Sequence, residues 1–176
     1  MGSRLARKVI VAGAPGAGKT SFARAFANLT GAAYTELDAL YHGPNWTKRP
    51  TFEADLDAFT SQADWITEWQ YEEAQPLLAA RADTLIWLDF PLPVVLARVT
   101  RRTVGRWVRK EELWAGNREQ PLWRIFTDPS NMIRWSFASR HAVRDALPEV
   151  LAKNPHLAVR RLSSPRQARR FLRAAR

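Results

Sequence analysis

The segment AGAPGAGKT at residues 12–20 constrains this chain more than any other, and it directly follows the apolar run VIV at residues 9–11. It fits the phosphate-loop pattern G-x-x-x-x-G-K-[ST], which joins a strand to a helix. Glycines let backbone N–H groups turn inward around phosphate oxygens, and the helix adds its positive end. The residues predicted to bind the nucleotide are Gly13, Ala14, Pro15, Gly16, Ala17, Gly18, Lys19, Thr20 and Ser21.

The motif also assigns chemistry to two side chains. Lys19 is expected to reach the β- and γ-phosphates, and the hydroxyl of Thr20 to ligate Mg²⁺. A guanine-specific switch would need an N-K-x-D signature, and the sequence has none. A motor would carry a strand that ends in paired acids, whereas the two strands with acids here end in single ones, Glu68 and Asp89.

Composition sets broad limits. A chain of 176 residues is predicted to form one domain, residues 1–176, with a substantial core. It has no cysteine and only three histidines, which argues against disulfides and a zinc site. No run of 18 apolar residues is present, so we expect a cytoplasmic protein without a membrane partner.

The charges are unevenly distributed along the chain. Residues 1–90 hold 8 Lys/Arg against 11 Asp/Glu, and residues 91–176 hold 19 against 6. The basic half suits a polyanion, either a nucleoside triphosphate or nucleic acid.

Strand and helix patterns alternate along the chain. Strands are predicted at residues 8–13, 32–37, 64–69, 84–90 and 156–162, and helices at residues 19–29, 52–63, 72–82, 91–108, 132–151 and 165–175. Residues 38–50 and 110–131 are expected to be irregular, and Pro148 is a candidate early end for its helix. This alternation is typical of a doubly wound α/β sheet, mostly parallel.

Several segments together carry a resemblance: the phosphate loop, TELDALYHGPNW, WITEWQY and TLIWLDFPLPVVLARVTRR. They resemble the adenylate-kinase-like nucleoside and nucleotide kinases. ELWAGNRE and VRRLSSPRQARRFL are similar to the topology modulation protein (FlaR-like) subgroup. The resemblance implies a three-layer phosphate-loop NTPase fold, with a five-stranded parallel sheet in the order 2-3-1-4-5 and helices on both faces. It also implies ATP and Mg²⁺, an acceptor-binding segment at about residues 38–63 and a basic lid-like segment at about 106–131.

The same resemblance suggests roles for two carboxylates. Asp38 stands where such kinases hold or deprotonate the acceptor hydroxyl, although an aspartate that starts a turn or helix is the plainer alternative. Glu68 stands where a carboxylate orients the water shell of Mg²⁺, alongside Thr20. The subgroup reads Asp-Gly-Asn-Tyr where this chain has Glu68-Trp69-Gln70-Tyr71. Trp69 therefore predicts a changed acceptor pocket. Trp46 either stacks on a planar acceptor or packs its loop against the core.

Three arginines complete the predicted catalytic set. Arg98 and Arg102 lie four residues apart on one helix face, in the helix that leads to the lid of the resembled kinases. Arg118 is the lid candidate. Fixed guanidinium groups stabilise the charge that spreads over a transferring phosphoryl group. Solvated surface positions are the alternative for each of them.

We therefore expect an enzyme that transfers the γ-phosphate of ATP to a small acceptor, with a nucleoside or nucleotide favoured. Two alternatives remain open at the level of sequence. One is a kinase that modifies an antibiotic or another metabolite hydroxyl. The other is a nucleotide-gated nucleic-acid-binding protein, since the C-terminal helix is rich in arginine and tryptophans lie among the basic residues of the lid. Both a monomer and a homodimer are compatible with the sequence.

Overall fold

The structure is a computed structural model that describes residues 7–109, 112–117 and 141–175. Its five strands are β1 (Lys8–Gly13), β2 (Ala33–Tyr34), β3 (Trp65–Glu68), β4 (Thr84–Leu88) and β5 (Ala158–Leu162). Its helices are α1 (Lys19–Thr30), α2 (Leu37–Tyr41), α3 (Phe52–Thr60), α4 (Gln75–Arg81), α5 (Leu92–Arg109), α8 (Ala142–Lys153) and α9 (Pro165–Ala174), with short 3₁₀ turns η1 (Pro44–Trp46) and η2 (Trp114–Gly116). None of these helices is both long and apolar enough to cross a membrane.

All strands are parallel and follow the order β2-β3-β1-β4-β5, which confirms the predicted sheet. The three central strands are buried on both faces, which explains their near-continuous apolar sequences. Val11 of β1 lies opposite Glu68 of β3, and Gly13 lies opposite Leu88 of β4. The register therefore brings the start of the phosphate loop and the carboxylate of Glu68 to the same edge of the sheet.

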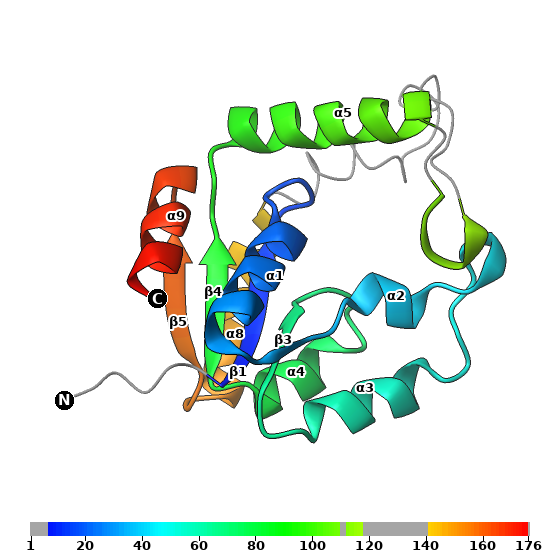
Figure 1. Ribbon diagram of the computed structural model, residues 1–176. Coiled ribbons are helices and arrows are strands. Elements are labelled where there is room, and N and C mark those ends of the chain that lie inside the picture. Colours follow the sequence, from blue (N-terminus) through cyan, green and yellow to red (C-terminus); the bar gives the residue numbers. More distant parts are fainter. Residues whose placement is uncertain (1–6, 110–111, 118–140, 176) are drawn as a thin grey trace.

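Helices cover both faces of the sheet, which gives the predicted three layers (Figure 1). One core packs α3, α4 and α8 against one face, with Trp65 and Leu85 at its centre. The other packs α1 and α9 against the opposite face. In this second core Phe171 of α9 lies 6.1 Å from Phe22 and 5.7 Å from Phe26 of α1, measured between ring centroids. Helix α5 leaves β4 and runs across the carboxyl edge of the sheet (Figure 1).

The prediction of a second strand at residues 32–37 was wrong in its length. Strand β2 ends at Tyr34, and a short helix in which Leu37 is fully buried begins directly after Glu36. Asp38 consequently lies in the first turn of α2 and not in an irregular loop.

Pro148 does not end its helix as expected, since α8 continues to Lys153 with Pro148 inside it. The carbonyl that Pro148 cannot pair belongs to Arg144, which is an exposed residue. The first part of the predicted helix, residues 132–140, lies outside the described residues.

Candidate functional site

The phosphate loop connects β1 to α1 as the sequence predicts. Gly13, Gly16 and Gly18 all have positive φ angles, and Lys19 is the first residue of α1. Its side chain is only 9% exposed, and Nζ donates a 3.0 Å hydrogen bond to the carbonyl oxygen of Gly13. Burial lowers the pKa of Lys19, while the nearby carboxylates of Asp38 and Glu68 raise it. The lysine thus lies within electrostatic reach of both predicted carboxylates.

Helix α5 rests directly on the phosphate loop. Gly16 has φ +88°, and a Cβ at this position would lie 2.8 Å from both the carbonyl oxygen of Val95 and the Cβ of Val99. Only glycine fits such a close approach, so this residue is needed for packing as well as for the shape of the loop. The sequence motif treats the position as variable and gave no sign of the contact.

One of the three predicted arginines contacts the loop, and a second acts electrostatically on Lys19. Nη1 of Arg98 donates a 2.9 Å hydrogen bond to the carbonyl oxygen of Ala17, and its guanidinium lies over the ring of Phe90. The charge of Arg102 contributes to lowering the pKa of Lys19, which places this arginine near the lysine. Arg118, the third, lies outside the described residues.

Glu68 and Thr20 come together beside Lys19. Glu68 is 1% exposed, and Oε1 accepts a 2.6 Å hydrogen bond from the hydroxyl of Tyr34. Burial raises the pKa of Glu68, while hydrogen bonds from Tyr34 and Thr20 lower it. The second carboxylate oxygen, Oε2, is buried and has no partner among the described residues. Sequence reasoning missed Tyr34, because no motif marks it.

These residues fit a magnesium ion that is bound together with a nucleotide. A hydroxyl and a carboxylate oxygen are ligands that Mg²⁺ accepts, and Glu68 Oε2 is an oxygen that still lacks a partner. The described part of the chain holds no group of three or more His, Cys, Asp or Glu side chains suited to a metal. An ion here would therefore rely on phosphate oxygens and water for its remaining ligands.

Asp38 does not cap its own helix. Its Oδ1 accepts a 2.6 Å hydrogen bond from the hydroxyl of Tyr71, which lies 3.1 Å from Nε2 of His42. The ring of Tyr71 stacks on that of Tyr41, with 3.8 Å between centroids and 7° between planes. Burial lowers the pKa of His42 below its usual value against the opposing effect of Asp38, and so favours the neutral imidazole. The participation of Tyr71 was also missed, because it depends on a contact across 33 residues.

Trp69 lies in the core under the acceptor segment. It is 6% exposed and packs in the cluster that contains Leu37 and Phe52, and its Nε1 has no partner among the described residues. Trp46 is 39% exposed, and its ring contacts His42 and Trp114. The rings of His42, Trp46, Tyr71 and Trp114 form what we call the aromatic wall beside Asp38. Whether this wall binds a ligand stays a prediction.

Asn117 ties the beginning of the lid-like segment to the acceptor segment. It is 7% exposed, and Nδ2 donates hydrogen bonds to the carbonyl oxygens of Gly43 (2.9 Å) and Trp114 (2.8 Å). Its Oδ1 accepts a 3.1 Å bond from the backbone N–H of Trp46. No sequence motif assigns a role to Asn117, so this link is visible only in the structure.

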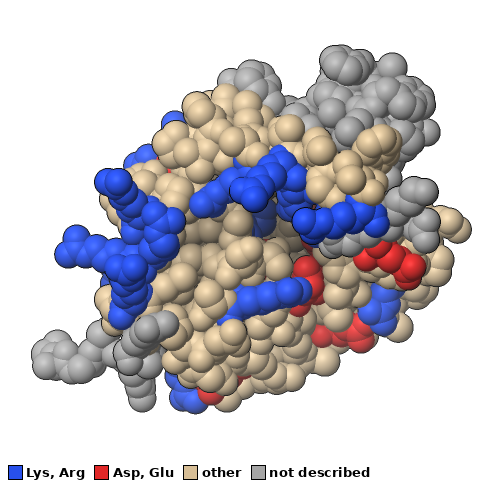
Figure 2. Space-filling view, turned by 45° about the horizontal axis from the view of Figure 1, so that its top comes forward, with Lys and Arg blue, Asp and Glu red and all other residues tan. Residues whose placement is uncertain are grey.

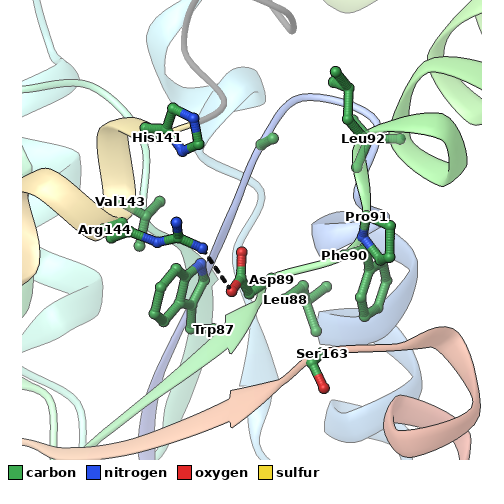
Figure 3. A pocket seen from close by; sticks show the side chains of 12 residues that line it. Trp87, Leu88, Asp89, Phe90, Pro91, Leu92, His141, Val143, Arg144 and Ser163 are labelled. Atoms are coloured by element: carbon green, nitrogen blue, oxygen red, sulfur yellow. Dashed lines mark hydrogen bonds and ion pairs between the residues drawn. The ribbon is translucent and has the colours of Figure 1, made fainter.

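A cavity of about 310 Å³ lies on the other side of the loop, at the carboxyl ends of β4 and β5. Ala14 lines it from the loop, together with Trp87, His141 and Ser163 (Figure 3). Asp89 projects into this region, where its Oδ2 pairs with Arg161 at 2.5 Å and with Arg144 at 3.4 Å. Two guanidinium partners give Asp89 a structural role at the end of its strand.

A scan of the sequence against protein-family models finds no match, and a search of curated proteins finds none either. Solved structures do match. A shikimate kinase from Acinetobacter baumannii in complex with shikimate has a TM-score of 0.55 and 16% identity, over 97% of this chain and 90% of that one. A gluconokinase from Sinorhizobium meliloti has a TM-score of 0.54 and 16% identity, over 98% and 94%. A shikimate kinase from Bacteroides thetaiotaomicron has a TM-score of 0.51 and 12% identity, over 96% and 95%. The chain therefore shares the fold of these phosphate-loop kinases, and nothing found here places it in the FlaR-like subgroup.

Proposed function

We propose that the protein is a kinase that transfers the γ-phosphoryl group of ATP to a hydroxyl of a small acceptor. The observation that carries this proposal is the convergence of Lys19, Asp38 and Glu68 at one edge of the sheet, where both carboxylates act on the pKa of the lysine. Phosphoryl transfer needs a positive group that binds phosphate, here the ammonium of Lys19. It also needs a nearby base that receives the proton of the acceptor, here the carboxylate of Asp38.

The step itself is a displacement at phosphorus. The acceptor oxygen forms a bond to the γ-phosphorus while the bond to the β–γ bridging oxygen breaks, and the hydroxyl proton passes to Asp38. Lys19 and the loop amides would bind the β- and γ-phosphates, and Arg98 and Arg102 would stabilise the charge on the transferred oxygens. Mg²⁺, held through Thr20 and Glu68, would supply charge neutralisation between the phosphates.

The two substrates would lie on opposite sides of the loop. Strand β1 is central, and Asp38, Glu68 and Tyr71 lie on the β2–β3 side of it. The cavity beside Ala14 lies on the β4–β5 side and is large enough to take the base and ribose of ATP. Ligands of open α/β sheets bind at the carboxyl ends of the strands, and both sides meet this condition.

The aromatic wall beside Asp38 favours a nucleoside or nucleotide as the acceptor. His42, Tyr71 and Trp46 offer ring surfaces on which a base can stack. Small hydroxylated acceptors such as those named for the similar kinases, and antibiotics or other metabolites with a free hydroxyl, are the alternatives. The experiment must therefore compare these classes directly.

The test is transfer of label from γ-labelled ATP to a panel of nucleosides, nucleotides, sugar acids and aminoglycosides, with and without Mg²⁺. We expect labelled product from a nucleoside or nucleotide and from none of the others. The Lys19→Ala variant should lose transfer by at least about 100-fold while it keeps the circular dichroism spectrum of the parent. Near-normal transfer by this variant, or label that reaches no acceptor at all, would overturn the proposal.

One observation favours a second candidate, binding to nucleic acid. The outer face of α9 carries Arg166, Arg169, Arg170 and Arg173, all exposed and without an acidic partner among the described residues. Figure 2 shows basic side chains gathered on the side where α9 and α5 lie in Figure 1. Binding to single-stranded or duplex DNA that weakens steeply with salt, and that is lost in an Arg169→Glu, Arg173→Glu variant, would support this function.

A further inference from the structure

We propose that Tyr71 is a positioning residue that fixes the carboxylate of Asp38 and the tautomer of His42 at the same time. The inference deepens the proposed function, on which the role of Asp38 toward the acceptor depends. It starts from the two contacts of one hydroxyl: 2.6 Å to Oδ1 of Asp38 and 3.1 Å to Nε2 of His42.

The number of protons decides the direction of both hydrogen bonds. An ionised carboxylate can only accept, so Tyr71 must give its single proton to Asp38. The oxygen of Tyr71 can then only accept from His42, so the imidazole must carry its proton on Nε2. A neutral imidazole, the form that burial favours by lowering the pKa of His42, then leaves Nδ1 unprotonated. Nδ1 is buried and has no partner among the described residues, as expected for an unprotonated nitrogen that donates to no neighbour.

The backbone of Tyr71 is strained, which indicates that its side-chain contacts hold the residue in place. Its φ angle is +55°, a conformation that bulky residues rarely adopt. Such strain persists only where the surroundings over-determine the residue, and it is commonest at functional sites. Here Tyr71 is held in two ways. The face of its ring stacks on Tyr41, and its hydroxyl donates a hydrogen bond to Asp38.

The consequence for Asp38 is a fixed orientation. With Oδ1 occupied by Tyr71, Oδ2 is the oxygen that remains for the acceptor hydroxyl. A carboxylate held in one rotamer presents this oxygen at one position, and misplacement by about 1 Å can cost about 100-fold in rate. Without the tyrosine hydroxyl, Asp38 can rotate and His42 can change its tautomer.

The test compares Tyr71→Phe with Tyr41→Phe. Both variants keep their rings and therefore the stack, but only the first removes the hydroxyl that touches Asp38 and His42. The first readout is ¹⁵N NMR of the imidazole of His42, which is assigned with a His42→Gln variant and needs no substrate. We expect an Nε2–H tautomer in the parent and in Tyr41→Phe, and a mixed population in Tyr71→Phe. An Nδ1–H tautomer in the parent would overturn the proposed hydrogen bonds.

The second readout is steady-state kinetics with the best acceptor of the panel. We expect kcat to fall about 10- to 100-fold in Tyr71→Phe, with the KM for ATP within about 2-fold of the parent and Tyr41→Phe close to the parent. Equal kcat values for the two variants would overturn the positioning role while leaving the kinase function intact. If no acceptor is labelled even by the parent, the proposed function fails, and the NMR result still decides the hydrogen bonds.

Discussion

Nδ2 of Asn117 donates a 2.9 Å hydrogen bond to the carbonyl oxygen of Gly43, 74 residues earlier in the chain. The same side chain accepts from the backbone N–H of Trp46. One buried amide thus joins the segment that follows α5 to the segment that follows α2. The aromatic wall includes rings from both segments, since Trp114 contacts His42 and Trp46. Its shape therefore depends on this amide.

Replacement of Asn117 by alanine should destabilise the protein and loosen the acceptor side. The change leaves the buried carbonyl oxygen of Gly43 without its partner, which costs about 1–3 kcal/mol, and also removes the acceptor of the Trp46 N–H. We expect this loss in the free energy of unfolding in urea, together with a raised KM for the acceptor and an unchanged KM for ATP. Asn154→Ala is the control, because that amide donates only to the carbonyl oxygen of Val150 at the end of α8. Equal losses from the two variants would contradict a special role for Asn117.

Replacement of Gly16 by alanine should separate α5 from the phosphate loop. The new methyl group would meet Val95 and Val99 at 2.8 Å, and the φ of +88° adds strain. We expect the free energy of unfolding to fall by about 1–3 kcal/mol and the affinity for ATP to fall with it.

The matched control is Gly105, which lies in α5, the helix that packs on Gly16. Gly105 is helical, and a Cβ there would meet nothing within 4 Å. Gly105→Ala should therefore raise the free energy of unfolding by about 0.5–1 kcal/mol and leave ATP binding unchanged. Calorimetry with a non-hydrolysable ATP analogue measures binding for both variants. A Gly16→Ala variant that matches the parent in both measurements would rule out the close contact.

Glu68→Gln should stabilise the ligand-free protein and weaken its response to Mg²⁺. Glutamine keeps an oxygen to accept from Tyr34 but removes a charge that burial disfavours. Because the pKa of Glu68 is raised in the folded state, the folded protein retains this proton to higher pH than the unfolded chain does. The stability that protonated Glu68 contributes is present below the ordinary glutamate pKa of 4.5 and is lost as pH rises through the raised pKa of the folded state.

The stability difference between the variant and the parent should therefore grow with pH. At pH 8 we expect a melting temperature about 2–4 °C higher for the variant, the change that about 1 kcal/mol produces in a chain of this size, and a smaller difference at pH 4.5. Titration of Mn²⁺ into the nucleotide complex, followed by electron paramagnetic resonance, should show weaker metal binding by the variant. A variant that is less stable than the parent at pH 8 would contradict the expected cost of the buried charge.

The sequence predicted the phosphate loop and the central strands well, for physical reasons. A loop that wraps phosphate needs glycines at fixed positions, and strands buried on both faces need unbroken apolar runs, so both leave local patterns. The carboxylates of Asp38 and Glu68 were also found, through resemblance, and their roles remain predictions. Lys19 shows what a local motif can and cannot predict. Its place in the phosphate loop follows from the motif, whereas its proximity to Asp38 is visible only in the folded structure.

What could not be predicted depends on partners far apart in the sequence. Tyr71 reaches Asp38, and Asn117 reaches Gly43, through hydrogen bonds that no periodicity records. The early end of β2 has the same origin, because Leu37 gains more from burial in the core than from extending the strand. Tertiary contacts decide such local conformations over intrinsic propensity.

The contact between Phe171 and the phenylalanines of α1 has a consequence for how the chain is made. Helix α1 carries Lys19 and Thr20, yet its outer face is covered by α9, close to the C-terminus. During synthesis the packing of the phosphate-binding helix is complete only after α9 has left the ribosome. Contacts of such long sequence separation slow folding. A nascent chain that lacks α9 should therefore expose Phe22 and Phe26, a surface suited to a chaperone until α9 has been synthesised.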